Sequence, residues 1–394
     1  MLQRAEMREG PVCLKMVSRQ GRRRLLLSVA VLIVAAGFLA AIPQANAVEI
    51  ISAAPTELQA VSATSATDAW SVGYRDDGAE ALTLHWDGRS WSPVANPLRA
   101  KLWGVSALSP SDAWAVGAYA APRSHTVQIQ TLILHWDGST WTRVPSPNST
   151  SSINQLEGVS AVSANDVWAV GDSGTPGHPA FHALTLHWNG SRWSTMPAPG
   201  GELHAVSGVS SRSAWAVGFG NLLHWNGTRW SRQSIRTRSF LETVPVTRLL
   251  GVSALSSRNV WAVGNRCAHF GACIPRAEVI HWNGARWSPV SSPAPNRFAN
   301  HLTGVSAVSA RDAWAVGAYC TTRDCPRQHT LVLRWNGRRW STVPSPNPSS
   351  SSDLLAGVDA ISPTHAWAVG YRGGGSSGSG TLLLDWNGTG WSAP

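Results

Sequence analysis

Five histidines recur at one position of a repeated segment, directly before a tryptophan. Imidazole binds transition metals and carries protons near neutral pH, so such a set invites a metal or acid–base site. The five are His85, His135, His187, His224 and His281, and two further copies have Arg334 and Asp385 instead. Residues related by a repeat lie far apart unless they approach a common axis. We therefore predict a repeated structural hydrogen bond, with no metal site and no cofactor.

Acidic side chains could support glycoside cleavage, which needs two carboxyl groups facing one sugar. The acids of the loop regions are chiefly Asp76, Asp77, Glu80, Asp172 and Asp324. Their context singles out no pair, and the sequence contains no His-Glu-x-x-His motif and no phosphate loop. We predict no catalytic residue and favour a protein that is not an enzyme. A glycan-active hydrolase or lyase that uses these acids is the alternative.

Four cysteines lie in two loops that occupy equivalent places in neighbouring repeats. Cys267 and Cys273 share one loop, and Cys320 and Cys325 share the other. In an oxidising compartment the simplest pairing is two short-loop disulfides, Cys267–Cys273 and Cys320–Cys325. A link between the two loops is the alternative pairing, and a zinc site would need four sulfurs from two repeats to converge.

Tyrosine and arginine gather just after a repeated Val-Gly pair. All four tyrosines of the chain lie one or two residues beyond it, and Phe219 takes the same place in the fourth repeat. Both residue types are enriched at binding hot spots. The predicted ligand-binding residues are Tyr74, Arg75, Tyr119, Phe219, Arg266, Tyr319, Arg323, Tyr371 and Arg372. The competing interpretation is that the aromatic side chains cap the ends of strands.

The elements that must position these residues follow from three tryptophans that return seven times, as in Trp114, Trp136 and Trp141. Alternating apolar residues, with Gly, Pro and Ser between them, predict four short strands in each copy and no helix. Asp-Gly or Asn-Gly between the last two strands predicts a tight hairpin turn. We predict an all-β, seven-bladed β-propeller of four-stranded antiparallel blades over residues 48–394. Its repeats span about 58–97, 102–148, 156–199, 203–240, 250–296, 302–347 and 355–394.

Connection lengths separate the two ends of the predicted ring. The first-strand Val and the second-strand Trp are nine residues apart in every copy, and the two hairpin tryptophans are always five apart, whereas the other two connections vary. Variable loops on a rigid frame are the usual place for recognition, although loop length can also drift neutrally. The predicted ligand-binding residues and the cysteine loops belong to this variable end. The last copy stops at Trp391-Ser392-Ala393-Pro394, so we predict that residues 48–55 supply its fourth strand and close the ring.

Residues 1–47 read as a signal peptide. A basic segment precedes the uncharged run of residues 25–41, and Ala45-Asn46-Ala47 fits a signal-peptidase site. An uncleaved anchor is the alternative. We expect a secreted or cell-surface protein that is monomeric and free of the membrane after cleavage. Half of the net charge of +10 lies in residues 1–47, and the other arginines are spread along the repeats, so no nucleic-acid partner is predicted.

The repeated unit, Val-Ser-Ala…Asp-Ala-Trp-Ala-Val-Gly…His-Trp-Asn-Gly…Trp-Ser, resembles tryptophan-rich repeats of secreted bacterial propellers in the broad kelch and galactose-oxidase-like grouping. Its Trp-(Asp/Asn)-Gly-x-x-Trp turn is similar to the Asp-box of sialidase-type propellers. The double glycine of kelch units is missing, and tryptophan replaces the Asp-box serine. Sialidase catalytic residues and galactose-oxidase copper ligands have no counterpart. We predict a secreted, non-enzymatic scaffold that binds an extracellular glycan or protein through the variable end.

Overall fold

The computed structural model describes residues 56–75, 80–96, 98–122, 127–176, 181–235, 246–267, 274–373 and 379–394. All of them belong to one compact unit, Ala45–Pro394. The predicted signal peptide and residues 48–55 lie outside the described residues. Within the described part of the chain there is no helix, and hence none long and apolar enough to cross a membrane.

The described residues form 28 strands, and each tryptophan repeat contributes four consecutive ones, which we call a unit. The first, innermost strands are β1 (Thr56–Ser65), β5 (Lys101–Ser109), β9 (Ile153–Ser163), β13 (Leu203–Ser210), β17 (Val246–Ser256), β21 (Asn300–Ser309) and β25 (Asp353–Ser362). The second strands are β2 (Asp68–Arg75), β6 (Asp112–Pro122), β10 (Asp166–Gly174), β14 (Ser213–Gly218), β18 (Asn259–Cys267), β22 (Asp312–Cys320) and β26 (His365–Gly373).

The third strands are β3 (Glu80–Trp86), β7 (Val127–Trp136), β11 (His182–Trp188), β15 (Asn221–Trp225), β19 (Arg276–Trp282), β23 (Gln328–Trp335) and β27 (Ser379–Trp386). The outermost strands are β4 (Trp91–Pro93), β8 (Trp141–Arg143), β12 (Trp193–Thr195), β16 (Trp230–Arg232), β20 (Trp287–Pro289), β24 (Trp340–Thr342) and β28 (Trp391–Ser392).

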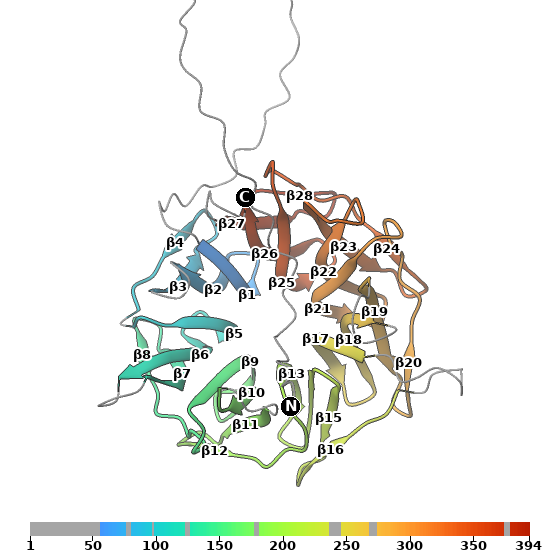
Figure 1. Cartoon of the computed structure of the whole chain (residues 1–394). Coiled ribbons are helices and arrows are strands. Elements are labelled where there is room, and N and C mark those ends of the chain that lie inside the picture. Colours follow the sequence, from blue (N-terminus) through green and yellow to red (C-terminus); the bar gives the residue numbers. More distant parts are fainter. Residues whose placement is uncertain are drawn as a thin grey trace, which may run out of the picture. The chain divides into compact units, whose positions relative to one another are not determined.

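Within every unit the four strands pair antiparallel in chain order. Five units are separate four-stranded sheets, whereas β5–β8 and β9–β12 belong to one eight-stranded sheet. Within the described ranges, one parallel pair joins those two units, Ile129 with Ile153. Figure 1 shows the sheets arranged as blades around a central axis with the first strands innermost. The predicted all-β propeller of four-stranded antiparallel blades is confirmed.

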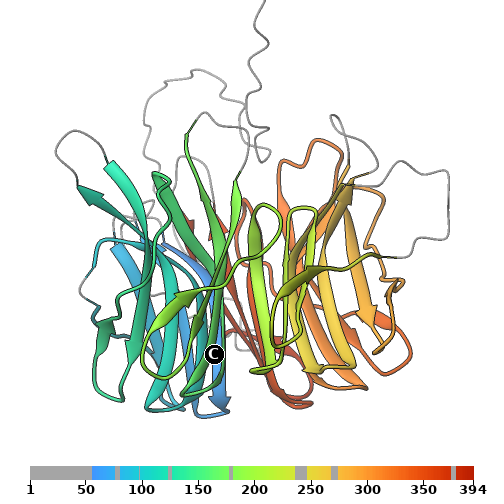
Figure 2. The same cartoon turned by 90° about the horizontal axis from the view of Figure 1, so that it is seen from below.

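The short and long connections lie at opposite ends of the blades (Figure 2). We call the end with the first-to-second and third-to-fourth connections the turn end, and the other the loop end. In the third-to-fourth turns the seven glycines have φ of 88° to 94°, the left-handed region that the Asp-Gly and Asn-Gly pairs predicted. The preceding side chain holds the turn: Asp87 Oδ1 accepts hydrogen bonds from the backbone N–H groups of Arg89 and Ser90, both at 2.8 Å.

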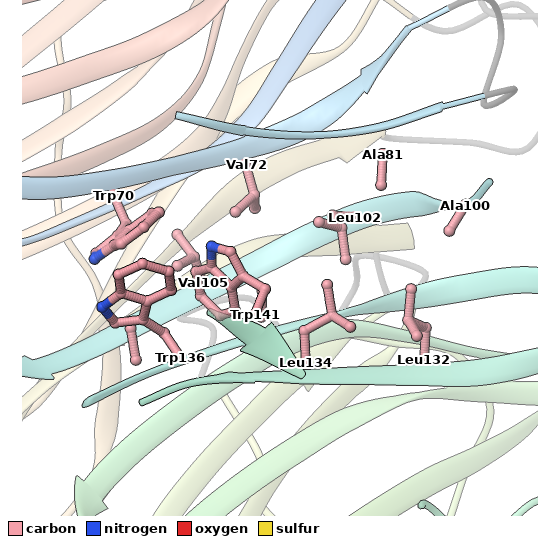
Figure 3. Packing of buried hydrophobic residues seen from close by; sticks show 12 residues of the cluster. Trp70, Val72, Ala81, Ala100, Leu102, Val105, Leu132, Leu134, Trp136 and Trp141 are labelled. Atoms are coloured by element: carbon pink, nitrogen blue, oxygen red, sulfur yellow. The ribbon is translucent and has the colours of Figure 1, made fainter. Parts of the chain in front are cut away.

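Tryptophans join each unit to the next. Trp70 packs against Trp136 and Trp141 of the following unit, with ring centroids 4.8 and 4.9 Å away (Figure 3). The same arrangement recurs at every seam, and the outermost-strand ring is always near perpendicular, at 79° to 88°. The strand-two tryptophans are nearly inaccessible to solvent. Since each such ring buries roughly 150–250 Å², these contacts are the main apolar link between units.

The ring closes by the same contact, and among the described residues the first and last sheets share no strand. Trp367 of the last unit packs on Trp86 and Trp91 of the first, at 5.0 and 5.1 Å. The last sheet already contains four strands, β25 to β28. The expectation that residues 48–55 supply a missing fourth strand is therefore wrong in its premise, because the two-residue β28 fills that place.

A ring of side-chain hydrogen bonds links the first strands. Ser62 Oγ accepts a hydrogen bond of 3.0 Å from the backbone N–H of Ala107 in the next unit, and serines repeat this at five further seams. At the seam between the last and first units the acceptor is Asp359, whose Oδ2 lies 2.8 Å from the nitrogen of Ala63. Burial at this seam raises the pKa of the Asp359 carboxyl.

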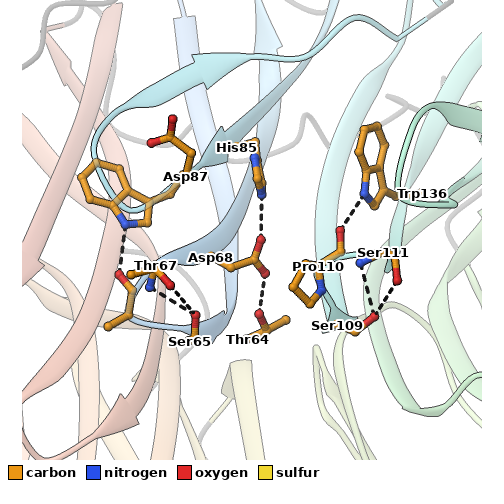
Figure 4. A network of polar contacts seen from close by, with 12 residues as sticks. Thr64, Ser65, Thr67, Asp68, His85, Asp87, Ser109, Pro110, Ser111 and Trp136 are labelled. Atoms are coloured by element: carbon orange, nitrogen blue, oxygen red, sulfur yellow. Dashed lines mark hydrogen bonds and ion pairs between the residues drawn. The ribbon is translucent and has the colours of Figure 1, made fainter.

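The recurring histidines form the structural hydrogen bond that the sequence predicted. His85 Nε2 lies 2.7 Å from Asp68 Oδ1 at the start of β2 (Figure 4). His135, His187 and His281 make the same contact to Asp112, Asp166 and Asn259, and His224 reaches Ser213. In the sixth unit Arg334 binds Asp312 through two bonds of 2.9 and 3.0 Å. Each histidine ring also packs, tilted, against its strand-two tryptophan, so it helps to hold the tryptophan ring that enters the next unit.

Small residues let neighbouring first strands approach each other closely. One layer of the ring consists of Ala60, Gly104, Gly158, Ala205, Gly251, Gly304 and Gly357. A Cβ atom on Gly158 would lie 2.9 Å from the Cα of Ala205, closer than side chains normally approach. The narrow centre of the ring therefore depends on this layer having no side chain larger than a methyl group.

Replacing Gly158 with alanine tests this close approach. Because the new methyl would press on the backbone of the adjacent unit, we expect the free energy of unfolding to fall by about 1–3 kcal/mol. Gly390→Ala is the matched control, since a Cβ there meets nothing within 4 Å, and we expect it to change stability by less than about 0.5 kcal/mol. Denaturant unfolding of both variants measures the difference. Equal free energies of unfolding for Gly158→Ala and Gly390→Ala would show that the first strands can accommodate a methyl group between them.

Candidate binding site at the channel mouth

Each first strand interrupts its pairing with the second strand twice, and the interruption near the start of the strand is the one that concerns the channel. In β1 the register shifts between Leu58 and Ala60, and the other first strands shift at the corresponding place. Such a bulge leaves one residue without a ladder partner and turns its side chain to a new direction. The seven skipped residues, which we call the bulge residues, are Gln59, Trp103, Glu157, His204, Leu250, Thr303 and Ala356.

The bulge residues line a central channel. A cavity of about 200 Å³ is bounded by three consecutive residues of every first strand, such as Gln59, Ala60 and Val61. One layer of this wall is the small residues described above, and another is valine in all seven units. Only the bulge layer differs, and it holds seven different residue types.

Charged residues surround the loop end of this channel. The first strands begin at the loop end. In each of them a buried leucine stands directly before the bulge residue, and one further residue precedes that leucine. These preceding residues are Glu57, Lys101, Gln155, Glu202, Arg248, His301 and Leu354. Together with the bulge residues they form what we call the channel mouth. Burial and the nearby Arg248 charge lower the pKa of His301 to about 4, so that histidine is neutral at pH 7.

One side of the channel mouth is a continuous hydrogen-bonded chain across three units. Arg248 Nε donates to His204 Nε2 at 3.3 Å, which leaves His204 Nδ1 to donate to Glu157 Oε2 at 2.5 Å. Gln155 Nε2 then donates to Glu157 Oε1 at 3.3 Å and to Asp172 Oδ2 at 3.1 Å. The chain therefore runs from the Arg248 guanidinium through an imidazole, a first carboxyl group and an amide to a second carboxyl group, that of Asp172.

Asp172 is the buried end of this chain. It is 1% exposed, and its Oδ1 has no hydrogen-bond partner among the described residues. Burial raises the pKa of its carboxyl to about 7, and the charges of Glu157 and Glu202 act in the same direction. The hydrogen bond from Gln155 opposes this rise but does not cancel it. Near pH 7 the Asp172 carboxyl is therefore protonated in a substantial fraction of the molecules.

Tyr74 is central to the opposite side of the mouth. Its hydroxyl donates to Glu57 Oε2 at 2.6 Å, and the ammonium of Lys101 lies 4.6 Å from its ring centroid. Tyr371 lies in the adjoining seam, where burial and then the Glu57 charge raise its pKa to about 12. Two of the nine predicted ligand-binding residues, Tyr74 and Tyr371, therefore lie next to the channel mouth and interact with its residue Glu57.

Phe219 is the third predicted residue beside the mouth. It is 42% exposed and forms an isolated β-bridge with Arg248. Tyr119 and Tyr319 lie one residue further from their Val-Gly pairs and so face the other side of their sheets. Tyr119 donates to Gln130 on β7 at 2.6 Å, and Tyr319 stacks on His329 on β23. The structure thus does not bring the four tyrosines together.

The predicted arginines are dispersed over the loop end. Arg266 is paired with Glu278 at 3.1 Å, and Arg75 lies 3.8 Å from Glu80. Arg323 is exposed, and Arg372 is half-buried on β26. These side chains line the outer part of the loop end and do not converge on one point.

The predicted disulfide between Cys320 and Cys325 is present. The side chain of Cys267 and all of Cys273 lie outside the described residues, so their pairing stays a prediction. A disulfide at Cys320 removes two of the four sulfurs that a zinc site would need. Among the described residues, no cluster of His, Cys, Asp and Glu could hold a metal ion.

Sequence reasoning missed the bulge residues. The signal was present, because the position after the first-strand leucine carries a different residue in each of seven otherwise similar segments. Trp103, the one tryptophan outside the triplets, is among them. What the sequence lacked was the register, since a bulge sends this side chain into the channel against the period-two alternation.

Asp172→Asn tests the proton held in the mouth. The folded-state pKa of about 7 lies above the ordinary value of 3.8, so between these values the folded protein keeps a proton that the unfolded chain releases. The free energy of unfolding contributed by Asp172 therefore falls as pH rises from about 4 to 7. We expect melting curves of the variant and the wild type to diverge over this range, with the variant gaining at the higher pH. Asp87→Asn is the control, because Asp87 lies at an exposed turn where hydrogen bonds lower the pKa of its carboxyl; its melting temperature should differ from that of the wild type in a pH-dependent way only below about pH 4. A difference in melting temperature between Asp172→Asn and the wild type that stays constant from about pH 4 to 7 would refute the raised pKa of Asp172.

Comparison with known proteins gives the fold and no family. No family model matches the sequence, and no curated protein matches it. A structure of YCF48 bound to a D1 peptide is similar over 86% of this chain and 96% of its own, with 14% identity and a TM-score of 0.53. A structure of U3-55K covers 86% of this chain and 99% of its own at 12% identity and a TM-score of 0.53.

The WD40 repeats of RRP9 are a third similar structure, over 79% of this chain and 87% of that one, with 11% identity and a TM-score of 0.51. These similarities extend over nearly the whole length of each neighbour. At such identities they establish that the chain has a β-propeller fold with tryptophan-rich repeats.

Proposed function

We propose that this protein is a binding scaffold that holds an extended segment of a partner protein across the channel mouth. The observation that carries the proposal is the bulge layer, where seven units with a shared framework present seven different side chains. Packing explains the repeated positions, but it does not require this layer to vary. A surface whose residues differ around a ring can distinguish the direction and the sequence of a bound segment.

The channel suits side chains of a peptide better than a whole small ligand. Its volume of about 200 Å³ is below the roughly 300–1,000 Å³ typical of small-molecule pockets. Trp103 offers apolar surface on the wall, while Glu202 and Arg248 offer opposite charges at the rim. One or two side chains can enter, with the rest of the segment lying over the rim. A similar propeller, YCF48, has been solved with a D1 peptide, which supports this mode of use.

The proposed ring has seven blades. The single parallel pair between β7 and β9 is a contact between two blades, so the eight-stranded sheet counts as two. In support, the tryptophan contact from one unit to the next occurs seven times and returns to the first. We further propose that residues 1–47 export the protein and that it acts as a monomer outside the cell. The kelch and Asp-box groupings stay resemblances of the sequence.

A glycan-active enzyme is the second candidate. The pKa of about 7 at Asp172 beside Glu157 favours it, because glycoside hydrolysis pairs a protonated carboxyl group with an ionised one. Against it, Asp172 is 1% exposed and cannot touch a sugar without rearrangement. Release of reducing ends from a polysaccharide panel by the wild type, and loss of that release in Asp172→Asn, would favour the enzyme.

Linear peptides selected from a random library on the immobilised full chain test the peptide proposal. We expect Trp103→Ala to weaken binding of the selected peptides at least tenfold, because the largest apolar surface of the bulge layer is lost. Leu250→Glu, which places a charge in the same layer, should change which peptides are selected. Asp137→Ala at the turn end is the control and should alter affinity less than twofold. Unchanged affinities in both mouth variants, with melting temperatures that show a folded protein, would exclude the channel mouth as the site.

A further inference from the structure

Arginines that are scattered along the sequence gather at the turn end of four consecutive units. They lie in the first-to-second and third-to-fourth turns of the units β9–β12 to β21–β24, and all are exposed. The eight are Arg192, Arg212, Arg229, Arg258, Arg286, Arg311, Arg338 and Arg339. We call this surface the arginine face.

The two turns of a unit lie side by side, so their arginines share one surface. A Cβ atom on Gly284 would lie 3.0 Å from the Cβ of Arg258, in the other turn of the same unit. Arg311 lies as close to Gly337, at 2.9 Å, and Arg212 to Gly227, at 3.2 Å. Arg286 follows two residues after Gly284, so each of these turn pairs carries at least two guanidinium groups.

In the described part of these four units, no exposed carboxylate lies at the turn end to balance these charges. The acids at the turn end of the same units are Asp166 and Asp312, which are 8% and 6% exposed. Each is already engaged within its unit, Asp166 with His187 and Asp312 with Arg334. Among the described residues, no ion pair involves any arginine of the arginine face.

The rest of the turn end has the opposite character. The units β25–β28, β1–β4 and β5–β8 carry one arginine in their turns, Arg89, together with exposed Asp87 and Asp137. Backbone hydrogen bonds lower the pKa of Asp87, and the same bonds hold the pKa of Asp137 at about 2, so both are ionised. Positive charge is therefore concentrated on one side of the turn end, with eight arginines there against one on the other side, which a general need for solubility does not explain.

The chemistry of the arginine face fits repeated anionic groups. Guanidinium binds carboxylate, sulfate or phosphate through two parallel hydrogen bonds. Among the described residues the face has no helix for a duplex groove. The tryptophans beside its turns, Trp188, Trp282 and Trp335, are half-buried against rings of neighbouring units, which leaves little aromatic surface for single-stranded nucleic acid to stack on. Among the described residues the exposed large hydrophobic ones are Phe219 and Ile274, both at the loop end, so the turn end has no apolar anchor for a bilayer.

We propose that the arginine face binds an anionic polysaccharide. The polymer is held by its charged groups across neighbouring turns, on the side of the ring opposite the channel mouth. The protein can then hold a polymer at one end and a protein segment at the other. The sequence does not show this surface as a cluster, because the turns that carry these arginines are about fifty residues apart and come together only in the closed ring.

The test compares binding of dextran sulfate and polygalacturonate with binding of uncharged dextran, at several salt concentrations. The test variant carries Arg258→Ser, Arg286→Ser and Arg311→Ser, and serine or threonine already stands at these turn positions in other units. We expect tight, salt-dependent binding of both anionic polymers by the wild type. The triple variant should bind at least tenfold more weakly, and the slope of log K against log salt should shrink by about two to three.

Arg89→Ser is the matched control, because it removes a turn arginine from the other side of the ring, and its affinity should stay within twofold of the wild type. Thermal melting confirms that each variant is folded. Equal binding by the triple variant and the wild type would overturn the proposal, as would binding of uncharged dextran as tight as that of the anionic polymers. Tighter binding of duplex DNA or of anionic lipid vesicles than of either polysaccharide would assign the face to a different polyanion.

Discussion

The insertion of one tryptophan into the next unit is the contact on which the rest of the structure depends. In a single unit the indole of the strand-two tryptophan would be exposed to solvent. The two tryptophans of its hairpin would also lack the indole that the preceding unit packs against them, so neither face of a blade is buried alone. Trp70 needs Trp136 and Trp141, and the last such ring, Trp367, returns to the first unit. Stability therefore comes from closure of the whole ring, as in other repeat architectures where each unit contacts only its neighbours.

This constraint decides where the chain is free to change. Strand-two tryptophans, the histidine partners and the turn glycines are tied to one geometry by contact with adjacent units. Two sets of positions escape it, namely the bulge residues and the outward residues of the short turns. The first set holds seven residue types, and the second holds the arginine face. Both candidate surfaces thus lie where the packing imposes no residue type.

The sequence predicted the features that repeat and are local. Strand order, the positive φ at Gly88 and its equivalents, and a structural hydrogen bond at His85 follow from patterns within one repeat, whereas the partner of that bond, Asp68, was not predicted. It did not predict that Trp70 packs against tryptophans of the neighbouring unit, because the spacing of residues within one repeat does not show which residues of two units are in contact. Nor did it predict the bulge at Gln59, where one skipped residue overrides the strand alternation. Connection lengths pointed to the loop end, but the convergence of side chains on its centre required the register.

The seam between the last and first units follows the same logic with one difference. No chain segment connects these two units directly, so contacts alone must hold them. Here Asp359 replaces the serine of the other seams, and its second oxygen accepts the hydroxyl of Ser306 at 3.1 Å while the first accepts the N–H of Ala63. One side chain therefore ties three first strands together. Because burial raises the pKa of this carboxyl, the hydrogen bonds that close the ring depend on the protonation state of one side chain, whereas the serine hydroxyls at the other six seams do not titrate.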